Sequence, residues 1–241
     1  MHYSAAETSV VLLAAGRGKR MLQLTRDTPK PLLKVGDCTL IEYHLKNLQQ
    51  QGFRKVIINL AYLGNRISKH LGDGTRYGLR IVYSDESATG ALETAGGLQK
   101  ALPKIDSDPF VVVNADIWTD YPFAQILRYL NCQARLVMVK NPAHNRGGDF
   151  SLPESADLLR LNAEGQTSYT FSGIALYRKG VFARLDPGVQ ALAPIFHELI
   201  ARDQIEGEIF RGQWQDIGTP ERLAQLNHDY LQGLIKVTPD D

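Results

Sequence analysis

The chain has 241 residues, of which 44% are apolar and 22% are charged, and these proportions are typical of a soluble globular protein rather than a disordered one. The formal net charge of +1 disfavours a nucleic-acid-binding protein, and Cys38 and Cys132 have the spacing of neither a zinc site nor a disulfide framework. No apolar stretch approaches the roughly 20 residues that span a bilayer. We therefore expect a cytoplasmic, single-domain protein whose partners include neither nucleic acid nor membrane.

Helical and strand patterns alternate through the first 140 residues. The apolar run at 10–13 predicts a buried strand, and Thr39 with Glu42 forms a capping-box pattern that opens a helix ending before Gly52. Further strands are predicted at 55–60, 79–83, 109–114 and 134–140, with helices at 63–71, 94–102 and 122–130. This alternation is typical of an α/β fold with a mainly parallel sheet.

The pattern changes after residue 140. Short alternating runs at 158–162 and 169–177, with turn residues between them, predict a small antiparallel subregion within 141–178 that faces the substrate. The last part of the chain predicts a helix at 194–202, strand-like segments at 208–212 and 214–218, and a helix opened by Thr219 and Pro220.

The loop after the first strand is rich in glycine and in basic residues. Gly16 and Gly18 let the backbone approach a ligand closely, and residues 17–34 contain six basic side chains and one acid. Backbone N–H groups here could surround a triphosphate through charge-assisted hydrogen bonds. The cations available for this are Arg17, Lys19, Arg20 and Lys30.

Spacing excludes two known glycine motifs at this loop. A dinucleotide fingerprint requires glycine where the chain has Met21, and a Walker loop requires glycine and a hydroxyl where the chain has Leu13 and Arg20. The loop by itself is equally compatible with a tight strand-to-helix turn whose basic face is solvated. The rest of the chain has to decide between these interpretations.

Two aspartates follow predicted strands and are candidate metal ligands. Asn114 and Asp116 stand at the end of the strand at 109–114, and Asp216 precedes a glycine turn and a capped helix. Ligands of open parallel sheets bind outside the carboxyl ends of the strands, so Asp116 is expected near the phosphates. A carboxylate pair without histidine or cysteine suits Mg²⁺ better than zinc. Taken alone, one aspartate after a strand is more often a turn or capping residue, and the convergence of Asp116 with Asp216 is a hypothesis that depends on the fold.

Together these motifs resemble those of the sugar-1-phosphate nucleotidylyltransferases over nearly the whole chain. LAAGRGKRM at 13–21 and PKPLL at 29–33 are similar to the family's signature loop, NAD at 114–116 to its metal-binding segment, and WQDIGTPER at 214–222 to its second metal site. A narrower resemblance to uridylyltransferases of bacterial cell-wall recycling rests on LIEYHL, LETAGG, NADIWTDYPFA, NPAHNRGGDF, TFSGIALY and WQDIGTPERL.

The resemblance implies a Rossmann-like mixed sheet, UTP and a sugar 1-phosphate as partners, of which N-acetylmuramic acid α-1-phosphate fits best, and Mg²⁺ as cofactor. It implies a single domain in which 1–140 mainly bind the nucleotide and 141–241 mainly bind the sugar phosphate, as a monomer or weak homodimer. Mg²⁺-assisted, in-line attack of the sugar phosphate on the α-phosphorus of UTP would then give a UDP-sugar and pyrophosphate in peptidoglycan recycling.

The resemblance also assigns roles to individual residues by motif. The nucleotide would contact Ala14, Ala15, Gly16, Gly18, Lys19, Arg20 and Lys30, with Tyr83 and Gly90 near the base. The sugar phosphate would face Asn114, Asp149 and Asp216, and Mg²⁺ would bind Asp116 and Asp216. Arg20, Lys30 and Asp116 would act in catalysis.

Two departures from the family pattern and two alternatives stay open. Leu22 and Gln23 stand where the signature usually has Arg and Pro, and the segment 85–91 is longer than usual, so Gly90 is placed only to within a residue or two. The same chemistry on GTP with mannose 1-phosphate, or on TTP with glucose 1-phosphate, is one alternative. A non-catalytic nucleotide-sugar sensor is the other.

Overall fold

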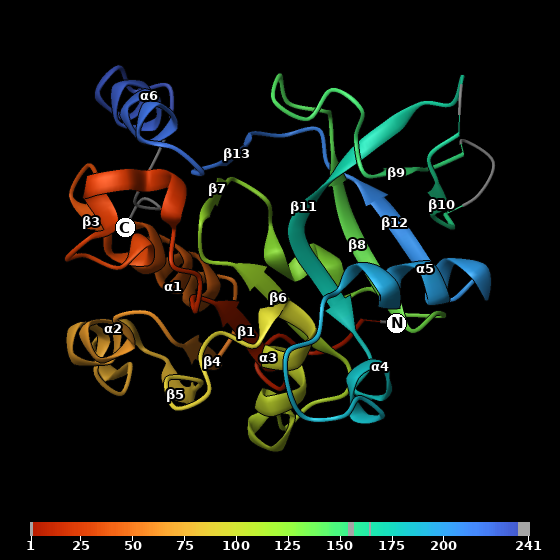
Figure 1. Ribbon diagram of the computed structural model, residues 1–241, viewed down its shortest axis with the longest axis horizontal. Helices are drawn as coiled ribbons and strands as arrows, with labels where there is room; N and C mark the ends of the chain where they lie inside the picture. Colours follow the sequence, from red (N-terminus) through yellow and green to blue (C-terminus); the bar gives the residue numbers. More distant parts are fainter. Residues whose placement is uncertain (1, 154–156, 164, 236–241) are drawn as a thin grey trace.

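The computed structural model describes residues 2–153, 157–163 and 165–235. At its centre are four parallel strands in the order β5, β4, β1 and β6 (Figure 1). Their bounds are Val10–Leu13 for β1, Lys55–Leu60 for β4, Arg80–Asp85 for β5 and Phe110–Asn114 for β6. Because the four strands are parallel, their carboxyl ends meet at one edge of the sheet, where the loop after β1 begins.

A mainly antiparallel extension continues this sheet beyond β6. The long strand β11, Ser168–Tyr177, pairs antiparallel with both β6 and β8, and β12 pairs parallel with β8. The remaining bounds are Ala134–Val139 for β8, Phe150–Ser151 for β9, Arg160–Leu161 for β10 and Ile205–Ile209 for β12. The result is one nine-stranded mixed sheet with a parallel centre, which confirms the predicted fold class and the antiparallel pairing within 141–178.

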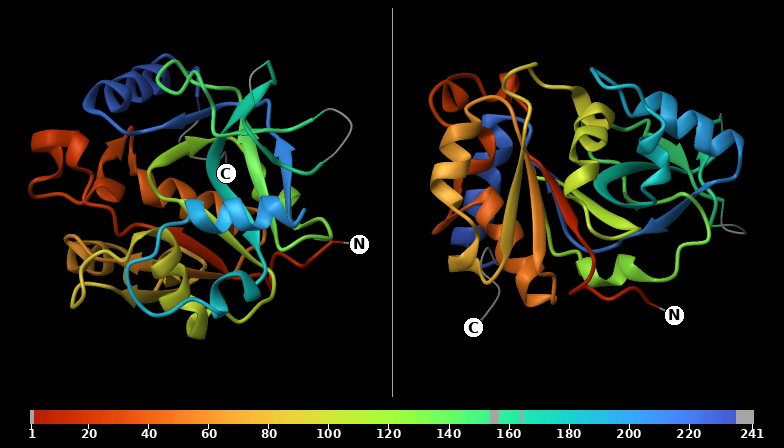
Figure 2. Two further views of the ribbon diagram at one scale, coloured as in Figure 1. Left: turned by 45° about the vertical axis from the view of Figure 1, so that its right-hand side comes forward. Right: turned by 90° about the horizontal axis from the view of Figure 1, so that it is seen from below.

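Helices cover both faces of the sheet, as Figure 2 shows from below. Successive strand residues point to opposite faces, so Val10 and Leu12 pack under one layer of helices while Val11 packs under the other. The first layer contains α1, Leu40–Gln50, and α2, Gly64–Leu71. The second contains α3, Glu93–Ala101, α4, Gly180–Ala183, and α5, Ala193–Ala201.

A third apolar cluster joins the last helix of the chain to its first loops. Helix α6, Pro220–Leu231, lies beside the β2–β3 hairpin (Figure 1), where the Asn227 side chain accepts a hydrogen bond from Gly36 N at 3.0 Å. The same cluster includes residues of the ribbon formed by β7 and β13. Bounds are Lys34–Val35 for β2, Cys38–Thr39 for β3, Ile117–Thr119 for β7 and Trp214–Asp216 for β13. Residues close to the two ends of the chain thereby build one wall together.

The structure corrects two predicted elements. In place of a helix over 122–130 there is a 3₁₀ segment, η5, Phe123–Leu127. The Arg135 guanidinium donates hydrogen bonds to the carbonyls of Ile126, Arg128 and Tyr129, which takes those acceptors away from a continuing helix. The strand expected at 208–212 lies instead at β12, Ile205–Ile209, where it extends β8.

The remaining helical segments are short and of the 3₁₀ type. They are η1, Lys19–Thr25, η2, Lys30–Leu32, η3, Thr75–Tyr77, and η4, Leu102–Lys104. Across the part of the chain that the structure describes, the helices lack the length and apolar character needed to cross a membrane.

Candidate active site

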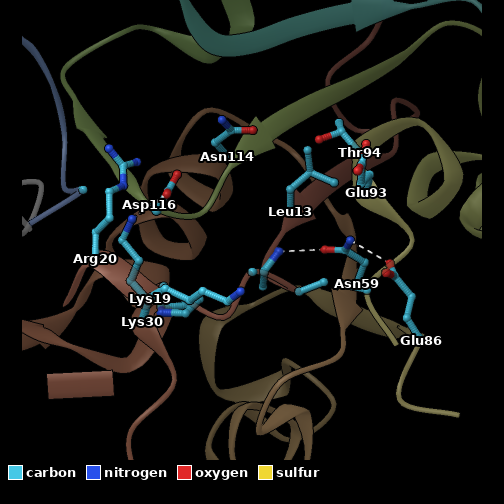
Figure 3. A pocket seen from close by; sticks show the side chains of 17 residues that line it. Leu13, Lys19, Arg20, Lys30, Asn59, Glu86, Glu93, Thr94, Asn114 and Asp116 are labelled. Carbon is cyan, nitrogen blue, oxygen red and sulfur yellow. Dashed lines mark hydrogen bonds and ion pairs between the residues drawn. The ribbon is translucent and has the colours of Figure 1, made fainter. Parts of the chain in front are cut away.

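A cavity of about 380 Å³ opens at the carboxyl ends of β1, β4 and β6. Figure 3 shows Arg20 and Asp116 on one side of it and Asn59 and Glu86 on the other. Of the residues expected at the nucleotide, the sugar phosphate or the metal, those that line it are Ala14, Ala15, Gly16, Gly18, Lys19, Arg20, Lys30, Asn114 and Asp116. The predicted edge of the sheet therefore carries a real cavity.

The two glycines of the loop after β1, Gly16 and Gly18, are required for different structural purposes. A Cβ at Gly16 would meet nothing within 4 Å, so this residue presents open backbone to the cavity. Gly18 has a φ of +63°, and a Cβ there would come within 3.3 Å of the Lys30 stem and of Thr25. Gly18 thus allows the turn that brings the loop back over Lys30.

Of the four basic residues predicted to contact the phosphates, Lys30 alone is buried, whereas Arg17, Lys19 and Arg20 are exposed. Only 6% of Lys30 is exposed, and its ammonium group donates to Asp116 Oδ2 at 2.5 Å. A buried ammonium group is costly unless it is paired. The pair therefore places a fixed positive charge and a carboxylate together in the cavity wall.

A buried chain of hydrogen bonds through Asn59 and Glu86, called the relay below, connects the loop after β1 to the opposite wall of the cavity. The sequence analysis did not predict it. Ala14 N donates to Asn59 Oδ1 at 2.6 Å, and Asn59 Nδ2 donates to Glu86 Oε1 at 2.8 Å. The other oxygen of Glu86 accepts from Leu92 N at 2.9 Å. These contacts hold the loops after β1 and β5 at one separation, and Figure 3 shows the two hydrogen bonds of Asn59 as dashed lines. The available signal was a polar Asn near the end of the apolar run 55–60.

Tyr83 and Gly90 do not line the cavity, contrary to expectation. Tyr83 stands two residues after Ile81 on β5, so both face the same core, and its hydroxyl donates to Gly72 O at 2.6 Å. From the segment after β5 the cavity is lined instead by Glu86, Ala91, Glu93 and Thr94.

The two candidate metal ligands lie at the same end of the β7–β13 ribbon, Asp116 in the turn just before β7 and Asp216 at the end of β13. Asp216 on β13 stands opposite Ile117 on β7, and Ile217 N donates to Asp116 O at 2.8 Å. Asp216 Oδ2 accepts a hydrogen bond from Arg222, and Oδ1 lies 3.0 Å from His144 Nε2 but accepts no hydrogen bond. The backbone pairing thus brings the main chain at Asp116 beside that at Asp216, although Asp216 does not line the cavity. Each carboxylate has a cationic neighbour, Lys30 for Asp116 and Arg222 for Asp216.

This donor set fits magnesium rather than a metal held by protein alone. Within the described residues no group of three or more His, Cys, Asp or Glu side chains could hold a metal ion. Mg²⁺ usually takes one or two protein carboxylates and completes its shell with substrate phosphates and water. Asp116 and Asp216 could therefore hold Mg²⁺ together with a bound triphosphate.

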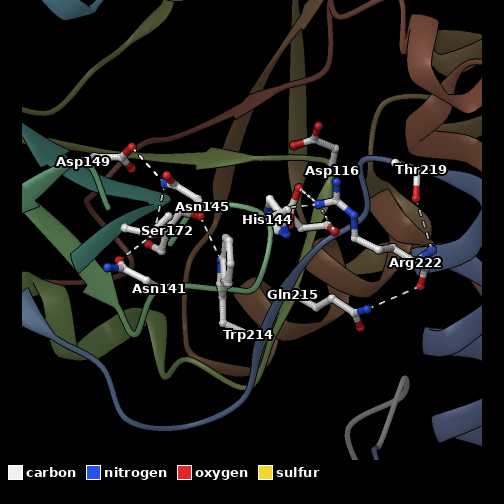
Figure 4. A network of polar contacts seen from close by, with 12 residues as sticks. Asp116, Asn141, His144, Asn145, Asp149, Ser172, Trp214, Gln215, Thr219 and Arg222 are labelled. Atoms are coloured by element: carbon white, nitrogen blue, oxygen red, sulfur yellow. Dashed lines mark hydrogen bonds and ion pairs between the residues drawn. The ribbon is translucent and has the colours of Figure 1, made fainter. Parts of the chain in front are cut away.

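A second polar network lies beyond the cavity, in the antiparallel subregion (Figure 4). Asp149 accepts hydrogen bonds from Asn145 Nδ2 at 3.1 Å and from Phe171 N at 2.8 Å. The Asn114 side chain packs against Gly173, which has a φ of +84°. A Cβ at Gly173 would stand 2.6 Å from Nδ2 of Asn114, so the glycine leaves room for this side chain to face the region. Asp149 itself is exposed and lies outside the cavity lining, so the structure does not bring it together with the loop cations.

Comparison of the amino-acid sequence with known families gives a match: residues 9–151 fit the family model described as nucleotidyl transferase. The chain belongs to the nucleotidyl transferase family. The matched range includes the glycine loop, Lys30 and Asp116, so this nucleotidyltransferase has its family signature where the cavity lies.

Named relatives extend the match over about nine tenths of the chain. N-acetylmuramate alpha-1-phosphate uridylyltransferase of Neisseria meningitidis serogroup B is 44% identical over 222 residues, which are 89% of this chain and 95% of that protein. Mannose-1-phosphate guanylyltransferase catalytic subunit beta of Drosophila melanogaster is 26% identical over 94% of this chain and 62% of that protein. The structure of HddC from Yersinia pseudotuberculosis, complexed with GMP-PN, has a TM-score of 0.77 at 18% identity over 92% of this chain and 99% of that one, which shows a shared fold.

Proposed function

We propose that this nucleotidyltransferase joins UTP to N-acetylmuramic acid α-1-phosphate, giving UDP-N-acetylmuramic acid and pyrophosphate. A phosphate oxygen of the sugar 1-phosphate attacks the α-phosphorus of UTP in line, a new P–O bond forms, and the bond to the β-phosphate oxygen breaks. The 44% identity with a uridylyltransferase of that name, over almost the full length of both chains, is the observation that carries the proposal. Its place in peptidoglycan recycling remains a prediction from sequence.

The side chains of the cavity support this chemistry by position and charge. Lys30, Lys19 and Arg20 would contact the triphosphate, while the open backbone at Gly16 faces the nucleoside. The proposed sugar phosphate lies toward Asn114, with Asp149 beyond it on the sugar side.

Asp116 and Asp216 would hold Mg²⁺, which when bound supplies positive charge to the reacting phosphates. The nucleophile is an anion already, so the reaction requires no general base. The protein's contribution is to position two polyanions and offset their repulsion. The buried Lys30 suits that role, because the cavity wall fixes its charge before any ligand binds.

Two other functions remain to be tested against this one. The match to a mannose-1-phosphate guanylyltransferase supports the same reaction on GTP and mannose 1-phosphate as the second candidate. A sensor without turnover would have no need for the four groups that the chain retains, which are Arg20, Lys30, Asp116 and Asp216.

A pyrophosphate-release screen distinguishes these candidates. The purified protein is assayed with Mg²⁺ and each of the four common NTPs, crossed with 1-phosphates of N-acetylmuramic acid, N-acetylglucosamine, glucose and mannose. We expect the highest kcat/KM for UTP with N-acetylmuramic acid 1-phosphate. A maximum at GTP with mannose 1-phosphate would support the second candidate, and nucleotide binding without pyrophosphate release would support a sensor.

A further inference from the structure

Arg222 and His144 reach the same carboxylate from two different parts of the fold. Arg222 lies in the first turn of α6, and His144 lies in the loop between β8 and β9. The guanidinium Nη1 contacts Asp216 Oδ2 and lies 3.2 Å from His144 Nε2, which in turn is 3.0 Å from Asp216 Oδ1. Figure 4 shows His144 beside the guanidinium. The sequence did not single out Arg222.

One edge of the Arg222 guanidinium is left open. Within the described chain, Nη1 makes all the hydrogen bonds of the Arg222 side chain, and its partners are Asp216 and His144. Nη2 has no partner among the described residues and does not count among the buried polar atoms. A guanidinium held in this way by one nitrogen offers its remaining N–H groups in a fixed orientation.

The open edge lies at the rim of the cavity. Gly218 lines that cavity, and the Cβ it lacks would stand 3.1 Å from both Arg222 Nη2 and Asp216 Oδ2. With no side chain at Gly218, the guanidinium and the carboxylate lie directly beside a residue of the cavity lining, although neither of them lines the cavity itself. The Arg222 side chain is only 19% exposed, so its charge is partly desolvated.

This rim is also where the sugar is expected to lie. His144 contacts Arg222, while the next residue, Asn145, donates to Asp149, so one loop reaches both Arg222 and the polar network of the antiparallel subregion. Besides its 1-phosphate, N-acetylmuramic acid has a carboxylate on the lactyl group at O3, which neutral sugars lack. An acid of this kind is bound best by a guanidinium that can make two parallel hydrogen bonds.

We propose that Arg222, held in position by His144 and Asp216, binds the lactyl carboxylate and selects an acidic sugar 1-phosphate over a neutral one. This proposal rests on the proposed function, since it presupposes a sugar 1-phosphate in the cavity. Arg222 is a specificity-determining residue here and takes no part in the transfer of the uridylyl group.

The test compares two substrates that differ only in the lactyl group, N-acetylmuramic acid 1-phosphate and N-acetylglucosamine 1-phosphate, each with UTP and Mg²⁺. For Arg222→Gln we expect kcat/KM with the muramic substrate to fall by about 10- to 100-fold, mainly through KM, because hydrogen bonds to a charged group are lost. Because Arg222 also contacts Asp216, some loss is expected with the glucosamine substrate too, but about tenfold or more smaller, so the ratio of the two kcat/KM values is the readout. Arg222→Lys keeps the positive charge but not the paired donors, so its kcat/KM with the muramic substrate should lie between those of the parent and Arg222→Gln.

Arg146→Gln is the matched control, because it removes a positive charge from the loop that carries His144. It should leave the ratio of the two kcat/KM values unchanged, and unfolding curves check that all variants are folded. Equal losses on both substrates, or a change of selectivity in Arg146→Gln instead, would overturn the role of Arg222. Failure of the parent enzyme to use either sugar would remove the proposed function as well, whereas a selective parent and an equally selective Arg222→Gln would remove this inference alone.

Discussion

Lys30 shows how a single residue is prepared for phosphate chemistry before a ligand arrives. Its stem lies under the turn at Gly18, and its ammonium group meets Asp116 at the cavity wall. Flexible surface lysines lose side-chain entropy when they bind an anion. The folded chain has already ordered Lys30, so its charge is available without that loss.

Replacing Lys30 by methionine tests this role. Methionine fills the space of the stem but leaves Asp116 without its cation, so we expect a folded protein whose kcat/KM falls by about 100-fold or more. Lys34→Met is the control, because Lys34 is an exposed cation four residues along the same segment. Steady-state kinetics with UTP and the sugar 1-phosphate measure both variants, and a loss of less than about tenfold for Lys30→Met would contradict the role.

Helix α3 contains two glycines, and both are explained by what packs against it. A Cβ at Gly96 would stand 2.1 Å from Gly188 O, and a Cβ at Gly97 would stand 2.8 Å from Glu86 Oε1. The amide groups of Ala95 and Gly96 donate to Gln190 O, which caps the start of the helix from a distant segment. The glycines weaken the helix itself but let it contact both the relay and the segment after α4.

Gly96→Ala should therefore destabilise the protein although alanine is the better helix former. The added methyl group meets backbone, which cannot move aside as a side chain can, and overpacking of this kind costs about 1–3 kcal/mol. Gly180→Ala is the control at another helical glycine, where the nearest atom would be 3.7 Å away. Denaturant unfolding should show a lower midpoint for Gly96→Ala only, and an unchanged midpoint would show that the contact with Gly188 is not tight.

Stability of the whole molecule in acid depends on a histidine in its core. His44 on α1 is fully buried, its Nε2 donates to Ile117 O at 2.8 Å, and its Nδ1 has no hydrogen-bond partner among the described residues. Burial lowers the pKa of His44 to about 4. Because Ile117 belongs to β7, this contact joins the first helix layer to the strand that follows Asp116.

We therefore expect the free energy of unfolding to decrease as the pH falls from about 6.5 to about 4. In that range the unfolded chain binds a proton at His44 that the folded protein excludes, which amounts to about 3 kcal/mol for a shift of this size. His44→Gln keeps a donor for Ile117 O without the titration, so its unfolding free energy should vary less over this range. His197→Gln, at an exposed histidine, should follow the parent, and an equal pH dependence in all three proteins would contradict the assignment.

Much of the architecture was predictable from the chain alone, because the signals are local. Short apolar runs, the Thr39–Glu42 capping box and the glycine loop each depend on neighbouring residues, and all three are present in the structure. The helix predicted at 122–130 was wrong because its signal was not only local. The Arg135 side chain, on β8, donates hydrogen bonds to the carbonyls that a helix would use.

The family, the α/β class and the loop that lines the cavity each depend on motifs of neighbouring residues, so the amino-acid sequence was enough to predict them. Three features come from contacts between distant segments that the fold creates. The backbone at Asp116 pairs with the segment of Asp216, Asn59 and Glu86 join two walls, and Arg222 presents an open edge beside Gly218. Tyr83 packs against the core and does not line the cavity, because a motif gives a residue's neighbours in sequence and not the face of the strand on which it lies. Contacts between distant segments depend on how strands pair and helices pack, and such pairing leaves no pattern within any one segment.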